Sequence, residues 1–271
     1  MSDIPEPTDQ KLRLGGMALR NGLLVHGPTH WAAAIRTDDG EMKVASGRKP
    51  RIGTGAVERV PGLRGVAKLA EAMAVIPLVK KALPGAKLPM QDARTLAAMG
   101  VVSVTARAIR RPGAARSVAS EAAVALLSVT PALFALRQGE LASWHGVEHK
   151  SIAAYEQDGD VEEAAKEHDR CGSHLVAPML STSIAGAVAA HRAGLKGPAV
   201  DGAIALGSMA VAVEIFGWSE RHSETALARA FRRPGNELQR AVGTREPDDQ
   251  QLEVGRLAME EILRVEGGVD G

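Results

Sequence analysis

The first quarter of the chain alternates short apolar runs with glycine-containing breaks. A break at Gly27 precedes an apolar run that starts at Trp31, and the turn signal at 38–40 separates this run from a second one over 42–45. Such spacing is typical of short strands joined by tight turns. We therefore predict a β-rich part over residues 13–60. Residues 1–12 are acidic and proline-containing, and we expect a disordered lead-in there rather than a secretory signal.

From residue 61 to 271 the pattern changes to long runs rich in Ala, Leu and Val with wider polar spacing. This pattern favours helices, with breaks expected over 80–92 and 110–116, where Pro and Gly gather. The predicted fold is α+β: a mostly helical body with a small N-terminal β region, in one domain spanning 13–271.

Three apolar stretches raise the question of membrane contact: 122–136, 175–190 and 199–217. Their lengths lie at the lower edge for a bilayer, whose core needs about 20 apolar residues. In the third stretch Asp201 and Glu214 offset the apolar side chains, so the balance for insertion is close to zero. The sequence thus leaves insertion open, and we expect short membrane-associated helices.

Net charge and cysteine content indicate which binding partners and which cellular compartment to expect. The chain has 33 Lys and Arg against 32 Asp and Glu, a net charge of +1, which gives no bulk electrostatic reason to expect nucleic acid. Its one cysteine, Cys171, excludes an intramolecular disulfide and fits a reducing compartment. We therefore predict a cytoplasmic location, with a membrane surface as a partner and no nucleic acid. The oligomeric state is not predicted.

The sharpest local signal is an H-x-x-E-H pattern formed by His145, Glu148 and His149. Positions i and i+4 share one face of a helix, so the two imidazoles could bind a single metal ion. In the inverted zinc-protease helix the Glu acts as general base toward water, and we predict this catalytic role for Glu148. The competing interpretation is a surface helix that happens to carry two histidines.

A second cluster follows, in which His168, Cys171 and His174 are spaced three residues apart. Imidazole and thiolate are ligands that Zn²⁺ and similar transition metals prefer, so His168 or Cys171 could complete the site. Alternatively, Cys171 is a small buried hydrophobe and His174 a solvated cap residue.

Glu214 is a further candidate ligand because it lies within an apolar run, where a carboxylate is costly to bury unless it is paired or metal-bound. A two-His, one-carboxylate shell is commonly completed by such a late helical Glu. The alternative is a structural ion pair with Arg221 or Lys150.

Together these motifs resemble the YqhQ-like family, a domain of unknown function (DUF1385) described as a predicted metal-dependent enzyme. The resemblance rests on four blocks in the family's order: GGMALRNG with Gly27-Pro28; PGLRG at 61–65; WHGVEHK at 144–150 with AYE at 154–156 and HDRCG at 168–172; and PGNELQ at 234–239 with TREPDD at 244–249.

By position, the resemblance implies that His145, Glu148, His149, His168 and Cys171 belong to a metal site, and Glu214 falls where relatives have a Glu in a late hydrophobic helix. His174 is the least secure member, because relatives usually have Ser there. The chain departs from the family's pattern at two positions: relatives usually have Glu where this chain has Asn21, and Arg where it has His26. A lost carboxylate could alter the chemistry. Relatives are also typically polytopic membrane proteins whose segments are longer and more hydrophobic than these three. The resemblance therefore implies that this chain is a soluble or peripheral form, or one that retains the fold without full activity.

The predicted function is that of a metal-dependent enzyme, hydrolytic in type, with a divalent transition metal, Zn above all, as cofactor. The metal ligands would be His145 and His149, completed by His168, Cys171 or Glu214, and the substrate an unnamed small molecule or peptide. The alternative is a non-catalytic membrane-associated or interaction protein whose metal is structural or absent.

Overall fold

The computed structural model describes residues 11–52, 55, 59–60, 63–111 and 117–267. Most of the predicted lead-in, and the first two residues of the block at 61–65, lie outside this part of the chain. Of the lead-in, Lys11 donates a hydrogen bond to the carbonyl of Tyr155 (2.7 Å), and the amide of Leu12 donates to the Tyr155 hydroxyl (2.9 Å). Ordered contacts therefore begin before residue 13.

Four strands form an antiparallel sheet in the order of the sequence, as the alternating pattern predicts. Neighbouring strands are joined by short turns, the tightest being the two-residue turn between Leu19 and Gly22. The strands are β1 (Gly15–Leu19), β2 (Gly22–His26), β3 (His30–Arg36) and β4 (Met42–Arg48).

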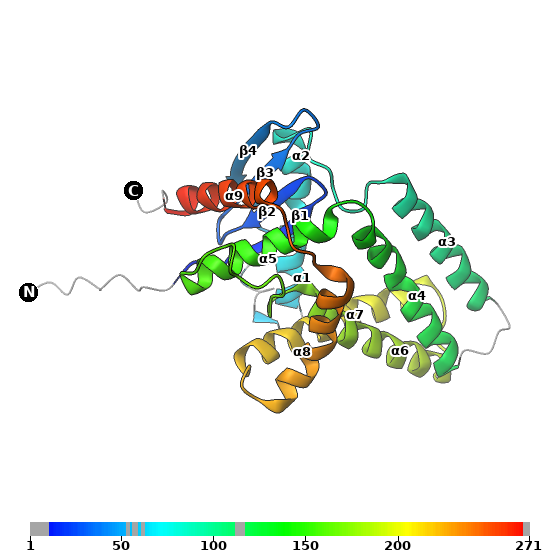
Figure 1. Cartoon of the computed structure of the whole chain (residues 1–271). Helices are drawn as coiled ribbons and strands as arrows, with labels where there is room; N and C mark the ends of the chain where they lie inside the picture. The colour runs from blue at the N-terminus through cyan, green and yellow to red at the C-terminus, as the bar shows by residue number, and fades with distance from the viewer. Residues whose placement is uncertain (1–10, 53–54, 56–58, 61–62, 112–116, 268–271) are drawn as a thin grey trace, which may run out of the picture.

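The two faces of the sheet are both covered, so side chains that alternate along one strand enter different cores. Leu23 and Val25 of β2 pack in a cluster with residues of two later helices, α5 (Leu141–Gln157) and α9 (Asp249–Gly267). Leu24, between them, packs on the opposite face with Val79. Figure 1 shows α5 and α9 lying across the sheet. The sheet is thereby the support on which α5, the helix of the H-x-x-E-H pattern, rests.

The rest of the described chain is mainly helical, so the α+β prediction is confirmed. The first predicted break, over 80–92, is confirmed, since one helix ends at Ala82 and the next begins at Ala93. At the second, one helix ends at Ile109 and the next begins at Val118, and residues 112–116 lie outside the described part of the chain. The other helices are α1 (Leu63–Ala74), α2 (Ile76–Ala82), α3 (Ala93–Ile109), α4 (Val118–Arg137), α6 (Val176–Arg192), α7 (Pro198–Arg221) and α8 (Ala226–Leu238).

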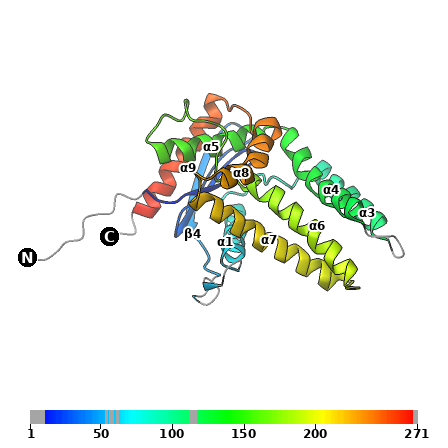
Figure 2. The same ribbon diagram turned by 90° about the horizontal axis from the view of Figure 1, so that it is seen from below.

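Four of these helices, α3, α4, α6 and α7, extend away from the sheet (Figure 2). Three segments are long and apolar enough to cross a membrane: Val118–Arg137, Gly172–Arg192 and Pro198–Arg221. They coincide with the three apolar stretches of the sequence. Only 28%, 17% and 11% of their most apolar windows is buried, so these helices present apolar side chains outward. Membrane association therefore fits the structure.

A carboxylate from the last helix holds the turn at Gly27 in place. Glu266 accepts hydrogen bonds from the amides of Thr29 (2.8 Å) and His30 (2.7 Å). A Cβ at Gly27 would lie 2.2 Å from the Glu266 Oε1 atom, so a larger residue there would displace this carboxylate from the two amides. The Gly-Pro pair is thus a tight turn closed by α9.

Candidate metal centre

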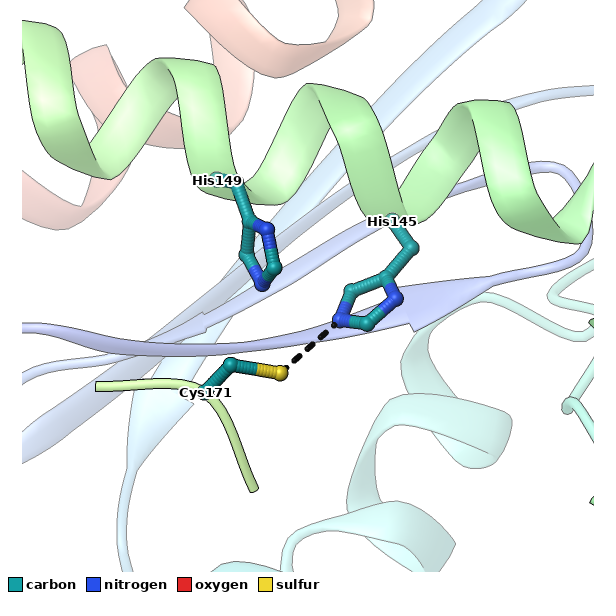
Figure 3. A group of neighbouring side chains, drawn as sticks. All are labelled: His145, His149 and Cys171. Atoms are coloured by element: carbon teal, nitrogen blue, oxygen red, sulfur yellow. Dashed lines mark hydrogen bonds between the residues drawn. The ribbon is translucent and has the colours of Figure 1, made fainter. Parts of the chain in front are cut away.

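His145 and His149 lie on one face of α5, one turn apart, with ring centroids separated by 4.3 Å. Both point toward Cys171, which comes from the segment before α6 (Figure 3). One donor atom from each of these three residues lies within 4.8 Å of the other two. Among the described residues this is the group of side chains whose donors converge as metal ligands do.

Backbone carbonyls orient both imidazoles. The Nδ1 atom of His145 donates to the carbonyl of Gly243 (2.8 Å), and Nδ1 of His149 donates to the carbonyl of Lys166 (2.6 Å). Because Nδ1 carries a proton in both rings, Nε2 of each histidine faces the other donors, and in neutral His149 it holds a lone pair. Metal-binding histidines are held in the same way by a second hydrogen bond. Nε2 of His149 is buried and has no hydrogen-bond partner among the described residues.

Cys171 supplies the third donor from a buried position. It caps a short 3₁₀ turn, Gly172–Leu175, and its Sγ accepts a hydrogen bond from the amide of Ser173 (3.4 Å). The same sulfur lies 3.4 Å from Nε2 of His145. Two ligands of a tetrahedral zinc ion are separated by roughly 3.5 Å, given bond lengths of about 2.0–2.3 Å. The His145 and Cys171 pair therefore has the spacing of two zinc ligands.

The two histidines differ in their affinity for protons. Burial lowers the pKa of His149, and the charge of His145 lowers it further, to about 2. Burial also lowers the pKa of His145, but the hydrogen bond to Cys171 and the charge of Glu148 outweigh burial and raise the pKa to about 9. His149 is thus neutral at physiological pH, whereas the His145 and Cys171 pair holds a proton that a cation would displace.

Glu148 lies beside the three donors, against strand β1. A Cβ at Gly16 would lie 2.5 Å from Cγ of Glu148, so the glycine makes room for this side chain. Burial raises the pKa of Glu148, while the charge of His145 and a hydrogen bond from the Ala18 amide act in the opposite direction. A carboxyl with a raised pKa next to metal-type donors has the properties of a general base.

Gly146 allows α5 to approach the segment that follows α8. A Cβ at Gly146 would lie 2.2 Å from the carbonyl oxygen of Arg245, and the Arg245 amide donates to the carbonyl of Ala142 (2.9 Å). The carbonyl of Gly243, which orients His145, belongs to the same segment. The glycine inside the H-x-x-E-H pattern therefore sets the distance between α5 and this support.

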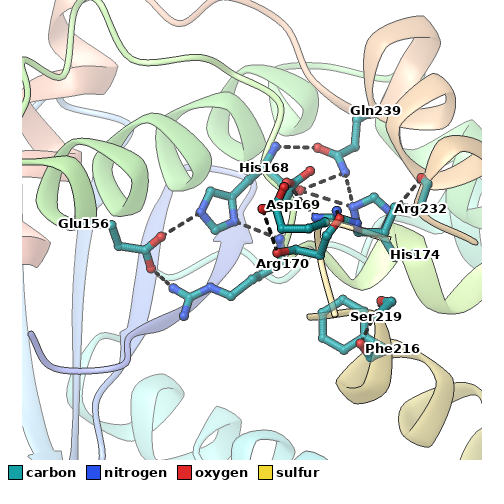
Figure 4. A network of polar contacts seen from close by, with 11 residues as sticks. Glu156, His168, Asp169, Arg170, His174, Phe216, Ser219, Arg232 and Gln239 are labelled. Atoms are coloured by element: carbon teal, nitrogen blue, oxygen red, sulfur yellow. Dashed lines mark hydrogen bonds and ion pairs between the residues drawn. The ribbon is translucent and has the colours of Figure 1, made fainter. Parts of the chain in front are cut away.

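His168 lies close to the three donors but both of its ring nitrogens are engaged. Its ring centroid is 5.7 Å from that of His149. Its Nδ1 accepts from the Arg170 amide (3.2 Å), and its Nε2 donates to Glu156 (3.2 Å), which also pairs with Arg170 (Figure 4). In this arrangement His168 serves to position the segment that carries Cys171.

His174 is buried in the same polar network rather than solvated. Its Nδ1 donates to the carbonyl of Arg232 (3.0 Å). Gln239, which is fully buried, accepts from the His168 amide (2.8 Å) and donates to the His168 carbonyl (3.1 Å). The network ties the segment around Cys171 to α8 and to the π-helical turn Gln239–Gly243. Both His174 and His168 lie outside the group of converging donors.

Glu214 also lies outside that group. It is a partly buried residue of α7 with an interaction of its own. Lys150, one of the partners considered for it, instead pairs with Glu246 (3.2 Å) and donates to the carbonyls of Glu162 and Ala164. The structure therefore brings together His145, His149 and Cys171 from the five predicted ligands, with Glu148 beside them.

The two departures from the family's pattern lie elsewhere on the sheet. The Asn21 side chain donates to the carbonyls of Arg36 (2.9 Å) and Gly85 (3.1 Å) and accepts from the Lys87 amide (2.9 Å). A carboxylate could not make the two donations, so the amide suits this turn. His26 is buried in β2, and neither ring nitrogen has a partner among the described residues.

A cavity of about 330 Å³ opens beside the three donors. His145, Glu148, Cys171 and Ser173 line one part of it. The other part is apolar and is formed by β1, the loop before α3, the end of α4 and the start of α5: Met17, Pro89, Met90, Ala132, Leu136 and Leu141. A small convergent polar group in a mostly apolar pocket is the usual composition of a ligand site.

Residues 138–265 match the family described as "Protein of unknown function (DUF1385)". These 128 residues are just under half of the chain's 271, and over them the chain is similar to this YqhQ-like family. It is similar to the "Uncharacterized protein YqhQ" of Bacillus subtilis (strain 168), with 24% identity over 306 residues that cover 93% of this chain and 92% of that protein. No solved structure matches the chain. The DUF1385 match runs from the start of α5 into α9, and so contains all three converging donors.

Several groups that shape the site carry no signal in the sequence. The carbonyls of Gly243 and Lys166 and the amide of Ala18 are backbone groups, which any residue type supplies. Gln239 could have been noticed, because it stands in the PGNELQ block that resembles the family. Its burial shows that this block supports the segment around Cys171.

Proposed function

We propose that the protein is a zinc-dependent hydrolase whose metal is held by His145, His149 and Cys171. The observation that carries this proposal is the buried Nε2 atom of His149, which lacks a hydrogen-bond partner among the described residues and faces two further donors. A buried polar atom without a partner is costly, and a cation would satisfy it. Imidazole and thiolate are the ligands that zinc takes in proteins.

Three protein ligands leave one position of a tetrahedral ion for water or substrate, which is the arrangement of catalytic zinc sites. An ion held there would supply Lewis acidity, polarising an oxygen of the substrate and making nearby water more acidic. Glu148 would take the proton of the attacking water and deliver it to the leaving group. Its position against Gly16 and its hydrogen bond from Ala18 keep the carboxylate beside the donors.

The competing function is that of a membrane-associated protein in which the metal is only structural. Structural zinc sites have four protein ligands. His168 is the nearest further imidazole, but its nitrogens are engaged by Arg170 and Glu156. The three-donor group, the neighbouring carboxylate and the adjoining cavity favour catalysis. We further propose that the site faces the cytoplasm, where the Cys171 thiol stays reduced.

The test is elemental analysis of protein purified without an affinity tag, beside the variants His149→Ala and Cys171→Ser. We expect about one zinc per chain in the natural protein and loss of at least nine-tenths of it in both variants. His222→Ala is the matched control, because His222 is exposed at the end of α7. Zinc that persists in both variants, or its absence from the natural protein, would refute the assignment.

A further inference from the structure

We propose that the substrate is a membrane amphiphile bearing an acyl chain, which lies in the apolar part of the cavity with its ester carbonyl beside Glu148. This inference rests on the proposed hydrolase function and names its substrate class. Among the described residues that line the cavity, polar side chains occur only next to the three donors. A sugar, nucleotide or charged peptide would find no polar or charged side chain along the remaining described lining.

The position of the cavity in the fold points to the bilayer as the source of this substrate. Ala132 and Leu136 line the cavity and belong to the last two turns of α4, one of the segments apolar enough to cross a membrane. Ala132 is exposed there, and so is Met90 on the loop before α3. The apolar lining is therefore continuous with a helix that suits lipid, and an acyl chain could enter without crossing water.

An extended peptide is the competing occupant, since β1 is an edge strand of the sheet beside the donors. Peptides commonly bind by adding a strand to such an edge. Here the amide of Ala18 donates to Glu148, and the Glu148 side chain lies against Gly16. The part of the edge nearest the donors is thus already in use, which favours an acyl chain over a peptide strand.

The reaction consumes one water and needs no other reactant. The water oxygen forms a bond to the acyl carbon, and the bond from that carbon to the alcohol oxygen breaks. Glu148 takes one proton from the water and passes it to the alcohol oxygen that leaves. The products are one fatty acid, which ionises to its carboxylate and a proton, and one alcohol.

The experiment uses full-length protein in detergent and a palmitoyl lysophospholipid that carries a diazirine near the end of the acyl chain. After illumination, cross-linked residues are mapped by peptide mass spectrometry, and zinc is measured in the same samples. We expect cross-links at Met17, Met90 or Leu136 and release of the fatty acid. Ala132→Trp should fill the apolar part and lower both signals about tenfold. Ala123→Trp, at another exposed alanine of α4, is the control.

The outcomes separate the two proposals. Zinc in the protein together with cross-links that avoid the cavity, or with an equal response of the two tryptophan variants, would overturn the acyl-chain substrate and leave the hydrolase standing. Cleavage of peptides but not of the acyl ester would do the same. Cavity cross-links in a protein without zinc would support acyl-chain binding and refute the metal-dependent function.

Discussion

The Nε2 atom of His145 lies 3.4 Å from the sulfur of Cys171, although 26 residues separate them in the chain. The contact depends on two supports, one for each partner. The carbonyl of Gly243 orients the imidazole, and the network around Gln239 places the segment that carries the thiol. Because both supports follow α8, the end of that helix positions both partners.

Gly146→Ala should weaken both the fold and the metal site. The added methyl group would lie 2.2 Å from the Arg245 carbonyl oxygen, so α5 must move away from the segment that contains Gly243. Overpacking of this kind costs about 1–3 kcal/mol. Disturbing a group that orients a ligand lowers metal affinity about 10–100-fold. Chemical denaturation and zinc titration with a competing chelator measure the two effects.

Gly267→Ala is the control for this substitution, since a Cβ at that helical position meets nothing within 4 Å. It should leave zinc affinity unchanged and alter stability by less than about 1 kcal/mol. Equal zinc affinities for the Gly146→Ala variant and the natural protein would contradict the role given to the 243–245 segment.

Glu148→Gln should abolish turnover while zinc stays bound. Glutamine keeps an oxygen for the Ala18 amide but cannot accept the water proton, and the loss of a general base lowers rates about 10²–10⁴-fold. Fatty-acid release and zinc content are measured on the same preparation. Burial raises the pKa of Glu148, and the base acts only when it is ionised. On acidification, activity of the natural protein should therefore begin to fall at a pH above the ordinary pKa of a glutamate. Loss of zinc from the variant would make Glu148 a ligand instead.

The sequence predicts the sheet, the helical body and the three apolar helices because each depends on local periodicity. It also predicts that His145 and His149 share a face, since their spacing fixes this on any helix. Cys171 joins them only through tertiary packing, which local pattern does not encode. His168 was an equal candidate from its residue type, and only its contacts with Glu156 and Arg170 distinguish it from Cys171.

The protein should remain in the membrane fraction after carbonate extraction and be released by detergent. From the sequence, the free energy of inserting the third apolar stretch is close to zero, and the family resemblance favours a soluble or peripheral form. The structure leaves large apolar side chains exposed on the helices that project from the sheet, such as Val101 (66%), Leu126 (62%) and Leu206 (64%). Patches of this kind mark membrane or protein contacts. Recovery of the protein in the carbonate supernatant would restore the peripheral interpretation.

Acidification should destabilise the sheet through His26. Burial, and to a smaller extent the charge of Lys49, lowers the pKa of His26 from 6.5 to about 4. The unfolded chain therefore takes up a proton below pH 6.5, whereas the folded chain does so only below about pH 4. Stability is full above pH 6.5 and is lost as the pH falls toward 4, by about 2.5 kcal/mol at pH 4.5, since each pKa unit is worth about 1.4 kcal/mol.

The variant His26→Leu should lack this part of the pH dependence. Urea unfolding at pH 7.5 and 4.5, followed by tryptophan fluorescence, measures it, because Trp31 pairs with His26 across the sheet. Buried His149, whose pKa is lowered to about 2, adds a loss of the same sign in both proteins, so only the difference between them reports on His26. His222→Leu, at an exposed position, controls for removal of an imidazole. Equal losses of stability on acidification in the natural protein and in His26→Leu would show that the folded sheet does not lower the pKa of His26.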